Sequence, residues 1–284
     1  RRAICLITRH PLRVAREEAI ARRKLELAQK RIARKDIVLS YDPTNCGSLE
    51  RFKTCKEASP CLFAKTAKLW GSPEFDRAKT VHENMLELLP ALLKYVSLVE
   101  EEEGVSRDGF LIEVRGIEHC KDLPAFAATV RAVLSAISER DPAGLNCINM
   151  KSILSPHWHL SLCTVPIFVT TFAPFYPVNS SRYMGELSAE NKDSCFILLQ
   201  PEESFYRHKI GMDTPHTNWT YPETIRDKIR INFREKGRDY YIPSTTSYAV
   251  AEQYVARPEN TNTNALVKPL VRFWETTNVP THSS

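Results

Sequence analysis

The chain reads H-W-H-L-S-L-C at residues 157–163, V-P-I-F-V-T-T-F at 165–172 and S-C-F-I-L-L-Q-P at 194–201, before closing on E-S-F-Y-R-H at 203–208. These runs are rich in the β-branched and aromatic residues that favour strands, so they predict a sheet. The links between them are short, which favours antiparallel neighbours because a parallel pair needs a long crossover. The expected strands are Trp158–Cys163, Ile167–Phe172 and Ser194–Leu199.

The residues upstream of this region mostly predict helices. Apolar residues recur on a helical period over 73–99 and 122–137, with Pro90 expected to kink or split the first helix and Asp122 expected to cap the second. Residues 110–115, between the two helices, predict one further strand. Helices that precede a group of strands indicate an α+β domain, here a mainly antiparallel sheet packed with helices.

A third helix and one more strand are expected after the sheet region. Thr220 and Glu223 have the spacing of a capping box, which marks a helix start, and Gly237 is a typical helix stop. The Asn- and Thr-rich stretch after Arg257 predicts a loop. Residues 267–274 are expected to add a strand at the edge of the sheet.

The positive charge of the chain is concentrated at its N-terminus. The 284 residues have a net charge of +5, but the first 40 contain 12 Lys or Arg and 4 Asp or Glu, a net charge of +8, and the remainder is at −3. A basic arm can bind nucleic acid or an anionic membrane, but this one lacks aromatic residues and a broad apolar stripe. We expect a solvated, charged helix and no nucleic-acid partner. The predicted units are a basic helical arm (1–45), a single α+β domain (46–275) and a tail (276–284).

The remaining composition is that of an ordinary globular protein. Hydrophobic residues make up 43% and charged residues 26% of the chain. No apolar run approaches the roughly 20 residues that a membrane helix needs. The 8 cysteines are spread singly without a C-x-x-C pair, which argues against structural zinc and favours reduced thiols and a cytoplasmic location. The chain also lacks a glycine-rich phosphate loop, so nucleotide binding is not expected.

Four short motifs occur in a fixed order along the chain. They are S-P-C-L-F-A-K at 59–65, S-S-R at 180–182, E-S-F-Y-R-H at 203–208 and A-E-Q-Y at 251–254. With the strands between them, this order resembles the YqcI/YcgG-type heme-binding proteins from about residue 49 to about residue 258. That family includes heme-dependent oxygenases that hydroxylate a guanidine nitrogen of arginine or a related compound. The resemblance therefore implies heme b as the cofactor.

Two residues compete as the axial ligand of the heme iron. His208 follows Phe205 in what looks like the family's F-x-x-H element, and a neutral imidazole is available near neutral pH. Cys61 follows Pro60, which suits the first turn of a helix, where unpaired N–H groups would stabilise a thiolate. We favour His208 as the iron ligand and expect Cys61 in or near the pocket, as a catalytic residue. A surface histidine and a small buried cysteine are the alternatives.

The other site candidates lie in or beside the same motifs. Arg182 looks like the arginine of the family's S-R element, and we expect Arg182, Arg207 and Phe205 to help hold the heme. The family's further arginines after this element are missing here, which weakens the assignment of Arg182. Glu252 and Tyr254 are expected to bind the substrate, because a carboxylate can hold a guanidinium through two hydrogen bonds. A loop arginine and a helix-surface glutamate are the alternatives.

His157 and His159 are spaced to lie on one face of the expected strand, where two imidazoles could bind a metal. No third ligand is near them in the sequence, so histidines of the core or the sheet edge are the simpler interpretation. The face of His159 is nevertheless a candidate pocket wall, and we expect His159 as a second catalytic residue. Trp158 points to the opposite face and is expected in the core.

Taken with the resemblance, these residues imply a heme-dependent oxygenase that hydroxylates a nitrogen of a small guanidino or amino-acid-like substrate. One alternative is a non-catalytic heme-binding protein for storage, transfer or sensing. Another is a cysteine-nucleophile enzyme using Cys61 with His159 or His208. The sequence shows no flavin or iron–sulfur motif, so an oxygenase would take its electrons from a partner protein. A second copy of the chain is the other candidate partner.

Overall fold

A five-stranded sheet forms the centre of the protein. The computed structural model describes residues 11–99, 107–149, 151–188, 191–257 and 271–275. The strands are β1 (Leu69–Gly71), β2 (Gly109–Arg115), β3 (Leu160–Leu162), β4 (Val165–Phe172) and β5 (Ser194–Pro201), in the spatial order β1-β2-β5-β4-β3. Among these strands β1 and β2 pair in parallel, and every other neighbouring pair is antiparallel. The predicted α+β fold with a mainly antiparallel sheet is confirmed, and β1 is an addition to the prediction.

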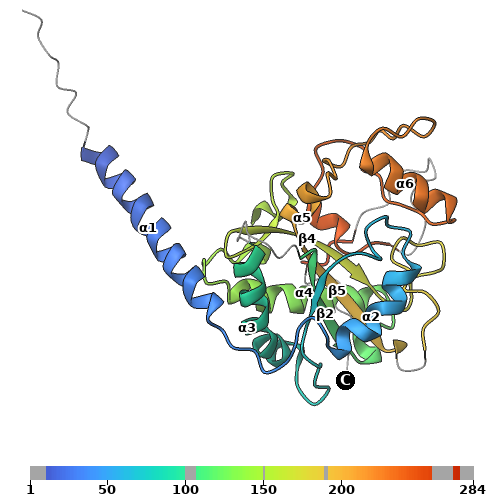
Figure 1. Ribbon diagram of the computed structural model, residues 1–284, viewed down its shortest axis with the longest axis horizontal. Helices are drawn as coiled ribbons and strands as arrows, with labels where there is room; N and C mark the ends of the chain where they lie inside the picture. Colours follow the sequence, from blue (N-terminus) through green and yellow to red (C-terminus); the bar gives the residue numbers. More distant parts are fainter. Residues whose placement is uncertain (1–10, 100–106, 150, 189–190, 258–270, 276–284) are drawn as a thin grey trace, which may run out of the picture.

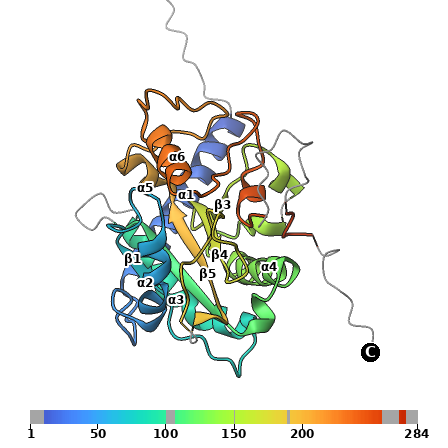
Figure 2. The same cartoon turned by 90° about the vertical axis from the view of Figure 1, so that its right-hand side faces the viewer.

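Helices cover both faces of this sheet. The helices α3 (Val81–Val99) and α4 (Leu123–Glu139) pack on one face, and α2 (Gly47–Ala58) packs on the other, as Figures 1 and 2 show. Residues of β2 alternate between the two sides: Ile112 belongs to the large core under α3 and α4, whereas Leu111 belongs to a smaller core with Phe52 of α2. The alternation follows from the pleat of a strand, which points successive side chains to opposite faces.

Two helices differ from the sequence-based prediction. The helix expected over 73–99 begins at Val81, because Thr80 and Glu83 form a reciprocal cap just before it. It runs as one helix through Pro90, so of the kink or split expected there, the split does not occur. The helix α2 has no counterpart in the prediction, and its N-cap residue Cys46 makes no side-chain capping bond. Packing of its buried side chains against the sheet stabilises it instead.

The later helices match the prediction more closely. The Asp122 side chain accepts a hydrogen bond from Ala125 N and caps α4, as expected. The helix α5 (Glu202–Arg207) is a short addition that directly follows β5. The helix α6 (Ile225–Glu235) is confirmed, but its capping box is formed by Thr224 and Asp227 rather than by the predicted pair four residues earlier.

The strands β3 and β4 form a tight hairpin. Its two-residue turn consists of Cys163 and Thr164, whose φ angles of 53° and 74° lie in the left-handed region. Positive φ at both positions is the signature of a type I′ turn, which normally carries Asn and Gly. The strand β3 starts at Leu160, two residues later than expected, and Trp158 is buried as predicted.

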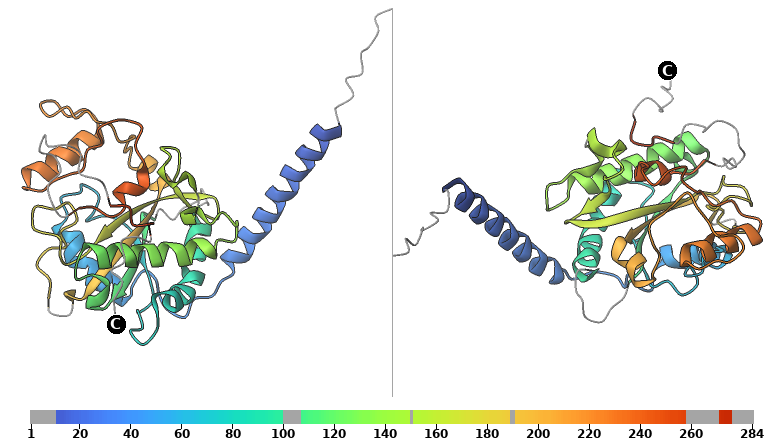
Figure 3. Two further views of the ribbon diagram at one scale, coloured as in Figure 1. Left: turned by 180° about the vertical axis from the view of Figure 1, so that it is seen from behind. Right: turned by 90° about the horizontal axis from the view of Figure 1, so that it is seen from above.

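The N-terminal helix α1 (Pro11–Lys35) projects from the body of the protein (Figures 1 and 3). Leu25 and Ile32 are 61% and 62% exposed, which agrees with the expected solvated helix. The contacts of α1 with the body lie near its C-terminal end, where Lys30 donates a hydrogen bond to Pro142 O over 3.1 Å. This helix occupies most of the predicted arm.

The C-terminal part of the chain differs from the expected edge strand. Residues 267–270 and the predicted tail lie outside the described residues, and 271–275 form a turn rather than a strand. Phe273 stacks on Tyr254 with ring centroids 6.0 Å apart, so this turn packs against the core. None of the helices in the described part of the chain combines the length and apolar character needed to cross a membrane.

Candidate functional site

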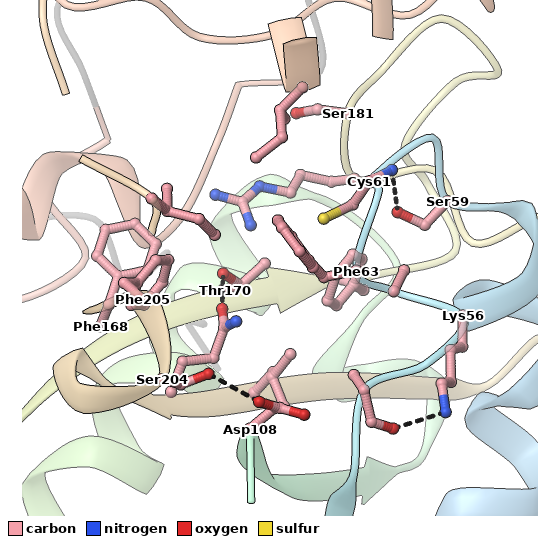
Figure 4. Close-up of a pocket in the computed structure, with 18 of the residues that line it drawn as sticks. Lys56, Ser59, Cys61, Phe63, Asp108, Phe168, Thr170, Ser181, Ser204 and Phe205 are labelled. Carbon is pink, nitrogen blue, oxygen red and sulfur yellow. Dashed lines mark hydrogen bonds between the residues drawn. The ribbon is translucent and has the colours of Figure 1, made fainter. Parts of the chain in front are cut away.

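A pocket lies on the α2 side of the sheet, between β4, β5, α5 and α6. It encloses about 210 Å³. Figure 4 shows Cys61 and Phe63 on one side of it and Phe168 and Phe205 on the other. Most of the wall is apolar and much of it aromatic, with side chains from Phe52, Phe63, Phe168, Phe172, Leu198, Phe205, Ile210, Ile229 and Phe233. A concave apolar wall with a few polar groups is typical of a small-molecule site.

His208 ends α5 and forms a hydrogen-bonded pair with Asp108 at the start of β2. The Nε2 atom of His208 lies 2.8 Å from Oδ1 of Asp108, and both residues line the pocket. The ring of Phe63 packs on the imidazole with centroids 4.4 Å apart. The carboxylate and the phenyl ring together fix the orientation of the imidazole.

Asp108 is buried but remains ionised. Burial alone would raise its pKa, but hydrogen bonds from Lys68 N, His208, Arg207 and Ser204 outweigh burial and hold the pKa below its ordinary value. Lys68 N donates to Oδ2 over 2.8 Å, and Ser204 Oγ donates to Oδ1 over 3.0 Å, as Figure 4 shows for Ser204. Asp108 is therefore a fixed negative charge beside His208.

Cys61 lines the pocket, but the predicted helix N-terminus is wrong. The residue lies in a turn after α2, where its N–H group donates to Ser59 Oγ over 3.2 Å. Burial raises the pKa of the Cys61 thiol, and the N–H groups of Phe63 and Ala64 offset only part of this effect. The side chain is therefore a neutral thiol at neutral pH, not the expected thiolate.

Arg182 also lines the pocket, as expected from the S-R element. One of its terminal nitrogens donates to Gln253 O over 3.1 Å, whereas Nε has no hydrogen-bond partner among the described residues. No carboxylate in that part of the chain forms an ion pair with this guanidinium, and burial lowers its pKa. Desolvation of a cation that no described carboxylate neutralises is costly, so this corner of the pocket suits an anionic group of a ligand.

Four of the expected site residues do not line this pocket. Arg207 lies just outside it and contacts Asp108 over 3.1 Å. His159 is exposed on the surface and precedes β3, so the fold does not bring it to Cys61 or His208. Glu252 lies 3.9 Å from Arg272 instead of facing the pocket. Tyr254 is fully buried in the core, where its hydroxyl group donates to Ile167 O over 3.2 Å.

Several residues of the pocket have no counterpart in the prediction. Asp108 and Gln253 are the most important ones, since Asp108 holds His208 and the buried amide nitrogen of Gln253 makes no hydrogen bond of normal length to a described residue. Thr170 and Gln200 form a hydrogen-bonded pair of 2.8 Å on the sheet floor. A polar residue directly before a buried strand is the signal that could have indicated Asp108. His157 and His159 are both exposed, and the described residues include no cluster of metal-binding side chains.

The chain is therefore an α+β protein with a largely aromatic pocket built around an imidazole–carboxylate pair. A model of the YqcI/YcgG family matches residues 50–265, and the chain belongs to this family. The match starts after α1 and includes every pocket residue named above. Comparisons with curated proteins and with solved structures give no match.

Proposed function

We propose that the pocket binds heme b and that the protein is a heme-dependent oxygenase acting on a nitrogen of a small guanidino or amino-acid-like substrate. The observation that carries the proposal is the His208–Asp108 pair in an aromatic pocket. Histidines that bind metals usually give their second ring N–H to a carboxylate or carbonyl, which fixes the tautomer. With Nε2 of His208 held by Asp108, Nδ1 is the nitrogen left for iron.

The chemistry of the wall fits heme. Aromatic side chains suit the faces of the macrocycle, and the guanidinium of Arg182, with its unpartnered Nε atom, suits a propionate. The enclosed volume of about 210 Å³ suits a small substrate and is tight for a macrocycle. Heme binding would therefore require the pocket to widen. When bound, heme supplies the activation of dioxygen.

The chain's own residues would hold and orient the reactants. Asp108 keeps the imidazole in one tautomer and supplies the negative charge that makes it a stronger ligand. Asp108 is also the one acidic residue among the described pocket residues, and its oxygens already accept bonds from His208, Ser204 and Lys68 N. A guanidinium substrate would therefore be held by aromatic faces and neutral oxygens rather than by an ion pair.

Two alternatives use the same side chains. His208 and Cys61 both line the pocket, which would also suit a six-coordinate, non-catalytic heme protein. The Asp108–His208 pair could instead orient a base for Cys61 as nucleophile. Against the nucleophile, burial raises the pKa of Cys61, and the described side chains show no hydrogen bond from its thiol to His208.

Titration of the full-length protein with hemin tests the proposal. We expect a sharp Soret band that saturates near one hemin per chain, and a further spectral change when arginine or another guanidino compound is added. A weak, non-saturating shift would contradict heme binding. A saturated Soret band that no nitrogenous substrate perturbs would favour the non-catalytic alternative.

A further inference from the structure

A basic groove lies beside the pocket, on the outer side of α2 and of the segment that leads into β1. Its volume is about 890 Å³. Two of the residues that line it are acidic, Glu50 and Glu57, and they are outnumbered by cations. The cationic residues are Lys53, Lys56, Lys65, Lys68 and Arg107.

Most of these positive charges form no ion pair with a described residue. Lys53 lies 3.7 Å from Glu50, in an exposed pair that contributes little. In the described part of the chain, no carboxylate forms an ion pair with the other four cations. Arg107 lies instead over the ring of Trp70, 4.6 Å from its centroid. With five cations against two glutamates, the described lining of the groove carries a net positive charge.

The groove and the pocket share one wall. Phe52, Lys56, Ala67 and Leu69 line both of them, and Lys56 closes the wall by donating to Ala67 O over 2.8 Å (Figure 4). A molecule docked in the groove is therefore separated from the pocket by a single layer of side chains. This short separation matters for electron transfer, whose rate falls steeply with distance.

We propose that the groove docks a small acidic protein that delivers electrons one at a time to the pocket. The proposal rests on the oxygenase function proposed above, in which R-NH₂, O₂, two electrons and two protons give R-NHOH and H₂O. Two reduced donors, each oxidised by one electron, are consumed per hydroxylated nitrogen. A positive patch speeds the encounter with an acidic partner, and weak, transient interfaces are typical of redox complexes.

A protein partner fits the groove better than a nucleic acid does. The two exposed glutamates among the cations would repel closely spaced phosphates, but basic side chains of a protein partner can pair with them. Single-stranded nucleic acids also need aromatic side chains on which bases can stack. The one aromatic residue of the groove wall, Phe52, is 3% exposed and packs in the core.

Binding of a plant-type [2Fe–2S] ferredoxin, used as an acidic one-electron probe, tests the proposal by calorimetry. We expect saturable binding of the oxidised probe to the full chain at low ionic strength, weakened at least tenfold in the triple variant Lys53→Glu, Lys65→Glu, Lys68→Glu. The matching Gln triple should give an intermediate loss. The matched control reverses Lys121, Lys192 and Lys228, which are exposed and lie outside the groove, and should change the affinity less than twofold.

The possible outcomes test the docking surface and the oxygenase function separately. Any of three results would overturn the docking surface: the probe does not bind, the Lys→Glu groove variant and the control variant lose affinity equally, or an oligonucleotide binds more tightly and displaces the probe. The binding experiment needs no heme, so a chain that binds the probe but not hemin keeps the docking surface and loses the oxygenase function. The control triple variant should take up hemin like the unmodified chain, since Lys121, Lys192 and Lys228 do not line the pocket. A thermal unfolding midpoint close to that of the unmodified chain excludes misfolding as the cause of a loss.

Discussion

The imidazole of His208 and the carboxylate of Asp108 lie 2.8 Å apart although 100 residues separate them in the sequence. Asp108 immediately precedes β2, and His208 ends the short helix that follows β5, the strand paired with β2. The antiparallel pairing of these two strands therefore brings the two residues together at one end of the sheet. The relationship depends on the topology rather than on a local motif.

The assignment of the axial ligand is tested by replacing the two candidate residues, His208 and Cys61, one at a time. His208→Ala should abolish tight hemin binding, and added imidazole should partly restore the Soret band by occupying the vacated position. Cys61→Ser should retain the heme, because the thiol is neutral and burial raises its pKa. A ferrous–CO spectrum with the red-shifted band of a thiolate ligand, lost in Cys61→Ser but not in His208→Ala, would reverse the assignment.

Replacing Asp108 by Asn should weaken hemin binding by roughly 10–100-fold, the usual effect of losing a residue that orients a metal-binding histidine. The matched control is Asp42→Asn, an exposed aspartate outside the pocket whose pKa is also lowered, mainly by hydrogen bonds from Thr44. Spectroscopic titration of both variants gives the comparison. Equal affinities for Asp108→Asn and the unmodified chain would show that the carboxylate does not act on the imidazole.

The same substitution should change how stability depends on pH. The pKa of Asp108 is lower in the folded protein than in the unfolded chain, so its contribution to stability is present above about pH 4 and is lost as the pH falls through the folded pKa. Asp108→Asn should cost on the order of 1–3 kcal/mol at neutral pH and less in acid. Denaturant unfolding of both proteins between neutral pH and acid checks this. A constant difference across that range would contradict the linkage.

The ion pair between Arg51 and Glu113 should contribute far more to stability than the ion pair between Arg51 and Glu74. Arg51 Nε and a terminal nitrogen donate to Glu113 over 2.8 and 2.6 Å, and the Glu113 side chain is 0% exposed. Arg51 also contacts Glu74, whose side chain is 60% exposed. Glu113→Ala should cost about 3–5 kcal/mol and Glu74→Ala less than about 1 kcal/mol, measured by denaturant unfolding. Similar losses for the two variants would show that burial does not set the strength of these contacts.

The N-terminal helix should be dispensable for the pocket. Deleting residues 1–33 removes the exposed part of α1 but keeps Arg34, which is 6% exposed. The Soret band with hemin should be unchanged, and the free energy of unfolding should fall by on the order of 1 kcal/mol for the loss of peripheral contacts such as that of Lys30. An insoluble truncation, or one that does not bind hemin although the full chain does, would show that the arm supports the body.

The sequence predicts the parts of this fold that depend on local patterns. The β-rich runs that form β4 and β5 and the Asp122 cap of α4 are confirmed because each rests on neighbouring residues. The strand β1 is different: it has 3 residues and exists through its pairing with β2. Likewise, α2 has weak amphipathic character and no side-chain cap, so it forms through its contact with the sheet.

The candidate site likewise has residues that local motifs indicate and residues that they do not. The motifs indicated four residues that do line one pocket: Cys61, Arg182, Phe205 and His208. His159 was expected on a strand, but β3 starts after it, at Leu160. Glu252 and Tyr254 belong to the A-E-Q-Y motif, and in this motif it is Gln253 that lines the pocket. The sequence marks Asp108 only as a polar residue directly before a buried strand, and its role depends on a partner that strand pairing brings near.

The turn between β3 and β4 offers a route to a more robust protein. Thr164 is exposed and β-branched, yet its φ is 74°, where L-residues lose roughly 1–2 kcal/mol relative to their preferred conformations. Glycine has no such penalty, so Thr164→Gly should raise the thermal midpoint without touching the pocket. Pocket substitutions that unfold the natural chain could then be introduced into this more stable variant, and their effect on the pocket could still be measured.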